Sequence, residues 1–198
     1  MRNAAKACRG CDLWKNATQT VFGEGPSKSR VMFVGEQPGD QEDLQGRPFV
    51  GPAGRILDKA LQQSGISRDE VYVTNAVKHF KSEPRGKRRI HKKPSAREIE
   101  ACNPWLQAEI RALHPEIVVC LGATAARSLF GPTFRVTVSR GQVLPFPPAS
   151  VAIATVHPSS ILRMREAESR HAAMQDFVDD LKQVRAWLDR HERLKTGT

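Results

Sequence analysis

Four short stretches of this chain are apolar at almost every position, and each ends in or precedes a glycine or a polar residue. They are rich in valine, isoleucine and alanine, as is typical of parallel strands that are buried on both faces. Because segments with helical spacing alternate with them, the pattern predicts an α/β protein, a three-layer α/β/α sandwich with a central four-stranded parallel sheet. The predicted strands are residues 30–35, 71–77, 116–122 and 151–156.

The segments between and after the strands carry helix signals. A capping box, Ser95-Ala96-Arg97-Glu98, begins the helix that contains Cys102, and Gly65 ends an earlier helix. Residues 131–150 are rich in proline and glycine, and we expect a surface excursion there rather than a linker between domains. The predicted helices are residues 52–64, 95–113, 123–129 and a long final helix that ends near residue 190.

Composition narrows the class of protein. With 198 residues, 39% of them hydrophobic, the chain can bury one core, so residues 1–198 are predicted to form a single domain. The formal net charge of +10 indicates an anionic partner, either a nucleic acid or an anionic membrane surface. No apolar run is long enough to span a bilayer, and the first residues lack the apolar segment of a secretory signal. We therefore expect a cytoplasmic protein with reduced thiols.

Cysteine spacing points to a metal site. Cys8 and Cys11 form a Cys-x-x-Cys pair before the first predicted strand, whereas a thioredoxin-like motif follows a strand. Two cysteines cannot complete a site with four ligands, so the other ligands must come from Cys102, Cys120 or a histidine.

Polar residues gather where the predicted strands end. Because the carboxyl ends of parallel strands meet at one edge of a sheet, these residues are expected to form a catalytic or binding site. Phe49, in a glycine-flanked loop, could either pack in the core or stack on a planar ligand. The strand-end candidates are Gly35, Glu36, Gln37 and Asp40 after the first strand, Asn75 in the second, and His157, Ser159, Ser160 and Arg163 after the fourth.

Positive charge is concentrated between Pro84 and Pro94. Six cationic side chains, among them Lys87, Arg88 and Arg89, surround His91 in the run from 85 to 93. A basic run of this kind is commonly a solvated loop, a targeting signal or a phosphate clamp. Together with the strand-end groups it favours a loop that contacts a polyanion and presents one imidazole.

The order of these motifs resembles the family 4 uracil-DNA glycosylases, which are iron-sulfur members of their superfamily. The resemblance covers about residues 5–190, and the segments 35–39 and 87–91 resemble the UdgX branch, whose hallmark is a covalent link to uracil-containing DNA. It implies a four-stranded parallel α/β/α sandwich, a 4Fe-4S cluster, and uracil-containing DNA as the partner. We expect this DNA to be single-stranded and the protein to be a monomer. The motifs that carry it are Cys8-x-x-Cys11, Gly35-Glu36-Gln37-Pro38-Gly39-Asp40, Gly46-Arg47-Pro48-Phe49-Val50-Gly51, Thr74-Asn75-Ala76-Val77-Lys78 and His157-Pro158-Ser159-Ser160.

One departure from the family pattern concerns the cluster ligands. Family 4 proteins carry a cysteine ligand in the segment that corresponds to residues 75–80, where this chain has His79. Either His79 or Cys120 would take its place, and we expect His79 because Cys120 lies in an apolar strand. Zinc is the alternative metal at the same residues. The expected ligands are Cys8, Cys11, His79 and Cys102.

The resemblance also implies roles for the strand-end residues. Phe49 would stack on an extruded uracil, Asn75 would read its O4 and N3-H, and His157 would donate toward O2 of the departing base. Gly35 and Gln37 would lie beside the base, and Asp40 is a further acid/base candidate.

His91 is expected to be the nucleophile. Oriented by Glu36, it would attack C1′ of the sugar in place of water, so that the protein acts once. The alternatives are an ordinary glycosylase that uses water and turns over, and a non-catalytic iron-sulfur protein that binds nucleic acid. The expected DNA contacts are Lys87, Arg88, Arg89, Ser159, Ser160 and Arg163.

Overall fold

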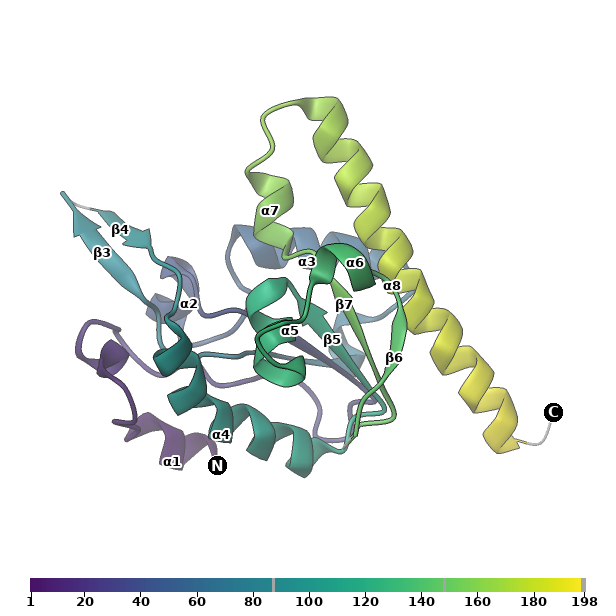
Figure 1. Ribbon diagram of the computed structural model, residues 1–198, viewed down its shortest axis with the longest axis horizontal. Helices are drawn as coiled ribbons and strands as arrows, with labels where there is room; N and C mark the ends of the chain where they lie inside the picture. The colour runs from purple at the N-terminus through teal and green to yellow at the C-terminus, as the bar shows by residue number, and fades with distance from the viewer. Residues whose placement is uncertain (87, 148, 197–198) are drawn as a thin grey trace.

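The computed structural model describes residues 1–86, 88–147 and 149–196. A five-stranded sheet in the order β2-β1-β5-β7-β6 forms the centre of the molecule (Figure 1). Its first four strands are parallel and almost entirely buried, which confirms the predicted architecture. They are β1 (Val31–Gly35), β2 (Val71–Asn75), β5 (Ile117–Leu121) and β7 (Val151–Thr155).

The fifth strand, β6 (Val143–Pro145), lies within the segment that was expected to be only a surface excursion. It pairs antiparallel with β7 at the edge of the sheet. Proline is tolerated there because an edge strand has one side without a hydrogen-bonded neighbour. The segment is short and rich in turn residues, so its sequence gave no alternating strand pattern.

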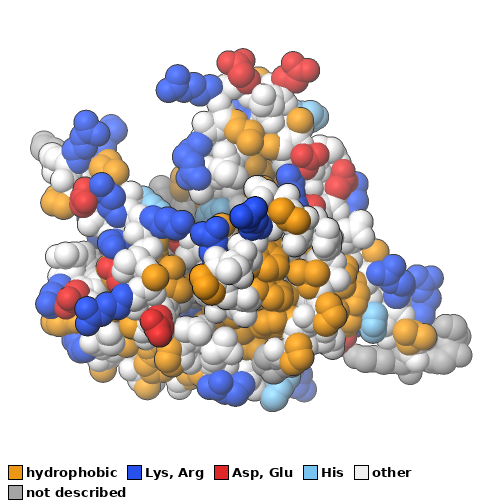
Figure 2. Space-filling view, viewed as in Figure 1, with side chains coloured by type: hydrophobic (Ala, Val, Ile, Leu, Met, Phe, Trp, Pro, Cys, Tyr) orange, Lys and Arg blue, Asp and Glu red, His pale blue; other side chains and the backbone are white. Residues whose placement is uncertain are grey.

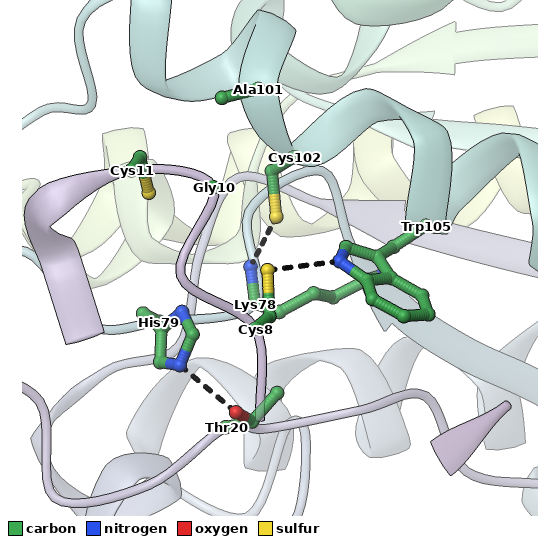
Figure 3. Close-up of a pocket in the computed structure, with 9 residues that line it drawn as sticks. All are labelled: Cys8, Gly10, Cys11, Thr20, Lys78, His79, Ala101, Cys102 and Trp105. Carbon is green, nitrogen blue, oxygen red and sulfur yellow. Dashed lines mark hydrogen bonds between the residues drawn. The ribbon is translucent and has the colours of Figure 1, made fainter. Parts of the chain in front are cut away.

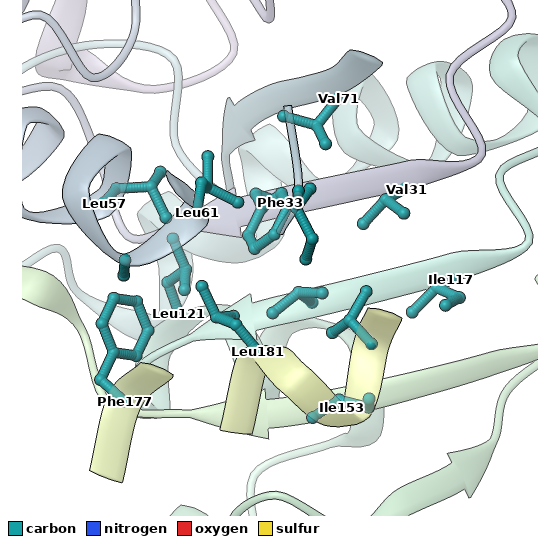
Figure 4. Close-up of a cluster of buried hydrophobic side chains, with 14 of the residues drawn as sticks. Val31, Phe33, Leu57, Leu61, Val71, Ile117, Leu121, Ile153, Phe177 and Leu181 are labelled. Carbon is teal, nitrogen blue, oxygen red and sulfur yellow. The ribbon is translucent and has the colours of Figure 1, made fainter. Parts of the chain in front are cut away.

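Helices cover both faces of the sheet. On one face α3 and α8 pack over alternate strand residues such as Val31 and Phe33, and Figure 4 shows this core. On the other face α4 and α5 pack over the intervening residues, such as Met32 and Val34. The α-helices are α1 (Arg2–Lys6), α2 (Asp40–Gln45), α3 (Pro52–Gln63), α4 (Ala96–Leu113), α5 (Ala123–Phe130), α6 (Val136–Ser139), α7 (Pro158–Leu162) and α8 (Ala167–Thr196), and two 3-10 turns are η1 (Asp12–Lys15) and η2 (Arg68–Glu70).

The basic run forms a hairpin rather than an irregular loop. Its strands β3 (Ser82–Arg85) and β4 (Arg88–His91) pair antiparallel and project from the body of the molecule (Figure 1). Gly86 supplies a positive φ of 60° at the turn. Both strands are largely exposed, so the apolar alternation that marks a half-buried strand is missing from the sequence. Lys87, expected to contact DNA, lies outside the described residues.

Across the described ranges, none of the helices combines the length and apolar character that crossing a membrane requires.

Candidate functional site

A cleft of about 960 Å³ opens at the carboxyl edge of the sheet. It lies between the β3–β4 hairpin and the region of α7, and Figure 2 shows the hollow with lysine and arginine side chains on both sides. The structure thus brings together most of the residues predicted from the strand ends. Those that line the cleft are Glu36, Gln37, Asp40, Phe49, Asn75, His91, His157, Ser159, Ser160 and Arg163.

Asn75 and Phe49 form the floor of the cleft. Asn75 is the last residue of β2 and is only 3% exposed. It pairs in register with Gly35, and a Cβ added to Gly35 would lie 2.4 Å from Asn75 Oδ1 and 2.7 Å from Phe49 Cζ. Phe49 has a positive φ of 57°, a strained conformation for a non-glycine residue of the kind that concentrates at functional sites. Glycine at position 35 therefore makes room for an amide and an aromatic ring side by side.

His157 presents a neutral N–H donor. Its Nδ1 accepts a hydrogen bond from the Ser159 amide at 3.2 Å, so in the neutral ring the proton is on Nε2. Burial, and then the electrostatic effects of Arg163 and His91 nearby, lower the pKa of His157 to about 4. The ring lies 6.1 Å from that of Phe49 at an interplanar angle of 29°. At neutral pH this side chain can donate a hydrogen bond to a bound group without carrying charge.

His91 faces a carboxylate across the cleft. Its Nε2 lies 3.4 Å from Oε1 of Glu36, while the other carboxylate oxygen accepts a hydrogen bond from the Thr124 hydroxyl. Thr124 is in the first turn of α5, where the positive end of the helix dipole also favours a carboxylate. Half of the His91 side chain is exposed, so the imidazole is both oriented by Glu36 and accessible from the cleft.

Arg89 connects the hairpin to α2. Its Nε lies 2.7 Å from Oδ1 of Asp40, and its Nη1 lies 2.5 Å from Oδ2 of Asp43. The guanidinium also lies over the ring of Phe80, 5.3 Å from the centroid. Arg89 and Asp40, predicted as a DNA contact and as an acid/base group, are thus paired with each other, whereas Arg88 is exposed on the same strand.

Gln37 holds the base of the hairpin. Its Nε2 donates to the backbone oxygens of Lys81 and Lys92 at 3.2 and 3.0 Å, and its Oε1 accepts from the Lys81 amide at 3.1 Å. The side chain of Gln37, a residue that was expected to lie beside the base, therefore joins both ends of the hairpin to the loop after β1. Gln37 and Arg89 together fix where β4 presents His91.

A second, smaller pocket contains the predicted cluster ligands (Figure 3). Cys8, Cys11, His79 and Cys102 all line it, while Cys120 is fully buried in β5 within a hydrophobic core. Two of the sulfurs accept hydrogen bonds: Cys8 Sγ from the Trp105 indole at 3.2 Å and Cys102 Sγ from the Lys78 amide at 3.2 Å.

These residues suit an iron-sulfur cluster. Three cysteines and one histidine supply four ligands, and N–H donors directed at ligand sulfurs are typical of such centres. His79 Nε2 lies 2.9 Å from the Thr20 hydroxyl, which leaves Nδ1 as the ring nitrogen available for iron. Burial lowers the pKa of His79 and so keeps the ring neutral, as a ligand must be. Within the described residues no three His, Cys, Asp or Glu side chains converge as a single metal ion requires.

Three contributors to these sites escaped the sequence patterns: Thr124, Asp43 and Glu109. Thr124 contacts Glu36, Asp43 contacts Arg89, and Glu109 contacts Lys78 deep in the interior. Each is a polar residue within a helix whose partner is distant in the sequence. In the sequence, Thr124 could have been noticed because it directly follows the strand-end segment 121–123. Asp43 and Glu109 gave no signal there, and only the structure shows that these two acidic residues are buried.

Comparison with known proteins gives a consistent result. The profile of the uracil DNA glycosylase superfamily matches residues 22–182. The Type-4 uracil-DNA glycosylase of Thermotoga maritima is 41% identical over 174 residues, which are 87% of this chain and 86% of the relative. That of Archaeoglobus fulgidus is 41% identical over 124 residues, 63% of this chain and 59% of the relative. The Type-5 uracil-DNA glycosylase of Pyrobaculum aerophilum is 33% identical over 143 residues, 65% of this chain and 60% of the relative.

Proposed function

This chain belongs to the uracil DNA glycosylase superfamily, and from that premise we propose that it excises uracil from DNA. The observation that carries the proposal is the meeting of Asn75, Phe49 and His157 in one cleft beneath a basic hairpin. An amide, an aromatic face and a neutral N–H donor are the groups that reading and releasing a uracil requires.

The proposed reaction begins with the base extruded into the cleft. Phe49 stacks on it, which contributes about 1 to 3 kcal/mol in comparable base-aromatic contacts. Asn75 offers a donor to O4 and an acceptor to N3-H, a pairing that the amino group of cytosine reverses. As the bond from C1′ to N1 breaks, uracil leaves with the electron pair, and Nε2-H of His157 stabilises the negative charge on O2.

The fate of the sugar cation is the finer part of the proposal. A lone pair on the imidazole of His91 forms a bond to C1′, so that the DNA becomes covalently attached and the protein acts once. The 3.4 Å contact between His91 and Glu36 supports this role, because Glu36 can accept the proton of the nitrogen that does not attack. An ordinary glycosylase would bring water to the same cation and turn over.

We further propose that Cys8, Cys11, His79 and Cys102 hold a 4Fe-4S cluster. When bound, such a group joins the N-terminal segment to α4 and to the segment after β2. The proposed substrate is single-stranded DNA bound by one copy of the chain, because the cleft is open between the hairpin and α7 and has cationic walls.

A single oligonucleotide experiment tests these alternatives. The protein is incubated with excess single-stranded DNA that contains one uracil, free uracil is counted per protein, and a denaturing gel is run. We expect about one uracil per protein and a stoichiometric upshifted band. Release of many uracils per protein without the band would indicate an ordinary glycosylase that turns over. Release of no uracil would indicate a protein that only binds nucleic acid.

The variant His91→Ser locates the covalent bond. It should lose the upshifted band and still release uracil, whereas the matched control His171→Ser, at an exposed position of α8, should behave as the wild type. A persistent band in His91→Ser would assign the bond to another residue.

A further inference from the structure

A buried ion pair lies behind the base-reading residue. The side chains of Lys78 and Glu109 are each 1% exposed, and Lys78 Nζ lies 2.5 Å from Glu109 Oε2. Glu109 also accepts hydrogen bonds from the Tyr72 hydroxyl at 2.9 Å and from the Gly23 amide at 3.1 Å. Since a buried pair of charges is seldom more stabilising than apolar residues of the same volume, its presence points to a role beyond stability.

Lys78 holds the backbone of Asn75. Its Nζ donates to the Asn75 carbonyl oxygen at 2.6 Å and to the Thr74 hydroxyl at 2.7 Å. The Thr74 hydroxyl in turn lies 3.0 Å from both carboxylate oxygens of Glu109. These contacts fix the last two residues of β2 to α4, so the direction of the Asn75 side chain depends on Lys78 and Glu109.

The same lysine reaches the cysteine pocket through its backbone. The Lys78 amide donates to Cys102 Sγ at 3.2 Å, and Figure 3 shows Lys78 beside Cys102 and Cys8 in that pocket. Cys102 and Glu109 lie two turns apart on α4, the helix against which Lys78 packs. One residue therefore contacts the pocket with its amide and the base-reading strand end with its ammonium group.

We propose that Lys78 and Glu109 form a positioning unit. It holds Asn75 in the orientation that distinguishes uracil from cytosine, and it links the position of Asn75 to the cysteine-histidine pocket. This inference rests on the proposed uracil excision. Neither side chain lines the cleft. The ammonium group fixes the Asn75 carbonyl, the carboxylate fixes the ammonium group, and α4 carries both the carboxylate and Cys102.

The test removes both charges with side chains of similar volume, and keeps one of the two acceptor oxygens of Glu109. Lys78→Met removes the ammonium donor to the Asn75 carbonyl, and in Glu109→Gln the glutamine oxygen can still accept from Tyr72 and Gly23. Uracil and cytosine release are measured in a single turnover at saturating DNA. We expect uracil release to slow about 100-fold, the loss that a misplaced binding group produces, and the preference for uracil over cytosine to fall.

A matched control separates positioning from stability. Leu106 is a fully buried residue of α4, and Leu106→Ala leaves a cavity in the hydrophobic core. If this variant loses as much Tm as the charge variant, it should still prefer uracil over cytosine as the wild type does. If the charge variant is folded and keeps both the uracil rate and the preference of the wild type, the inference is wrong.

A double-mutant cycle identifies the path of the effect. In an Asn75→Ala background, the Lys78 and Glu109 changes should cause no further loss of preference, because the group they position is absent. A full additional loss in that background would contradict a role through Asn75.

A milder pair of variants covers the case in which the charge variant does not fold. Thr74→Val and Tyr72→Phe each remove one hydroxyl that bonds to Glu109, but only Thr74 also accepts from Lys78. Thr74→Val should lower the preference for uracil and Tyr72→Phe should not, and equal effects would overturn the inference. Should the wild type release no uracil at all, the proposed function fails instead.

Discussion

Nε2 of His91 lies 3.4 Å from Oε1 of Glu36, although His91 comes from an exposed hairpin and Glu36 directly follows a central strand. The contact exists because the hairpin is attached at two places, by Gln37 at its base and by Arg89 along β4. Glu36 is itself held by Thr124 at the start of α5. The imidazole therefore has a defined partner despite its exposed position.

Glu36→Gln should slow formation of the covalent adduct about 100-fold, the usual size of a lost general base. A glutamine keeps the shape of the side chain but cannot take a proton from the imidazole. The rate is measured by quenched single-turnover gels. Glu83→Gln is the control, since Glu83 is a hairpin carboxylate that pairs with Lys92 instead. Equal slowing by both variants would argue against a specific role for Glu36.

Arg89→Met should reduce adduct yield while leaving uracil release largely intact. The change leaves Asp43, which is fully buried, without its cationic partner and frees β4 from α2. We expect a loss of about 1 to 3 kcal/mol in the free energy of unfolding, as for other buried groups that lose a partner. Denaturant unfolding and the ratio of adduct to free uracil measure the two effects.

Arg88→Met, on the same strand, should instead weaken DNA binding without changing that ratio. Arg88 is exposed, so its loss removes one phosphate contact and lowers the salt slope of single-strand binding by about 0.7. Fluorescence anisotropy at several salt concentrations gives the slope. An unchanged slope would place Arg88 outside the DNA path.

Acid should destabilise the protein partly through His157. An unfolded histidine titrates near 6.5, whereas burial lowers the pKa of folded His157 to about 4. Between these values the unfolded state binds a proton that the folded state excludes, so the free energy of unfolding falls as pH decreases from 6.5 to 4. Below that window this group causes no further loss.

His157→Gln should therefore lose less stability over the same pH range, by at most about 3 kcal/mol. Urea unfolding at several pH values measures the difference between the two proteins. His79, whose pKa burial also lowers, is present in both and cancels from the comparison. Parallel pH curves for wild type and variant would show that His157 does not titrate in this way.

The cluster ligands can be tested by metal content. Protein prepared without oxygen should be brown and contain iron, and Cys102→Ser should lose both the colour and the iron. Cys120→Ala is the matched control and should keep them, because Cys120 is buried in β5 outside the pocket. Zinc in place of iron would support the alternative metal at the same residues.

His79→Cys tests the remaining ligand. It should retain iron and lower the reduction potential, since histidine ligation raises the potential of an iron-sulfur centre. Retention of iron with an unchanged potential would exclude His79 as a ligand.

Local patterns along the chain were sufficient for the framework of the fold. Continuous apolar runs marked the four parallel strands, and the capping box marked the start of α4, because burial and capping act on neighbouring residues. The rule that parallel strands share a carboxyl edge then placed Glu36, Asn75 and His157 together before any contact was known. The net positive charge, which indicates an anionic partner, likewise follows from the sequence alone.

Contacts between distant segments were decided only by the tertiary structure. The sequence shows Arg89 as one cation among six, and only folding gives it Asp40 and Asp43 as partners. The pairing of Lys78 with Glu109 likewise requires α4 to pack against the end of β2. Hydrogen bonds and ion pairs depend on distances of a few ångströms, and periodicity specifies which face a residue occupies but not which side chain it meets there.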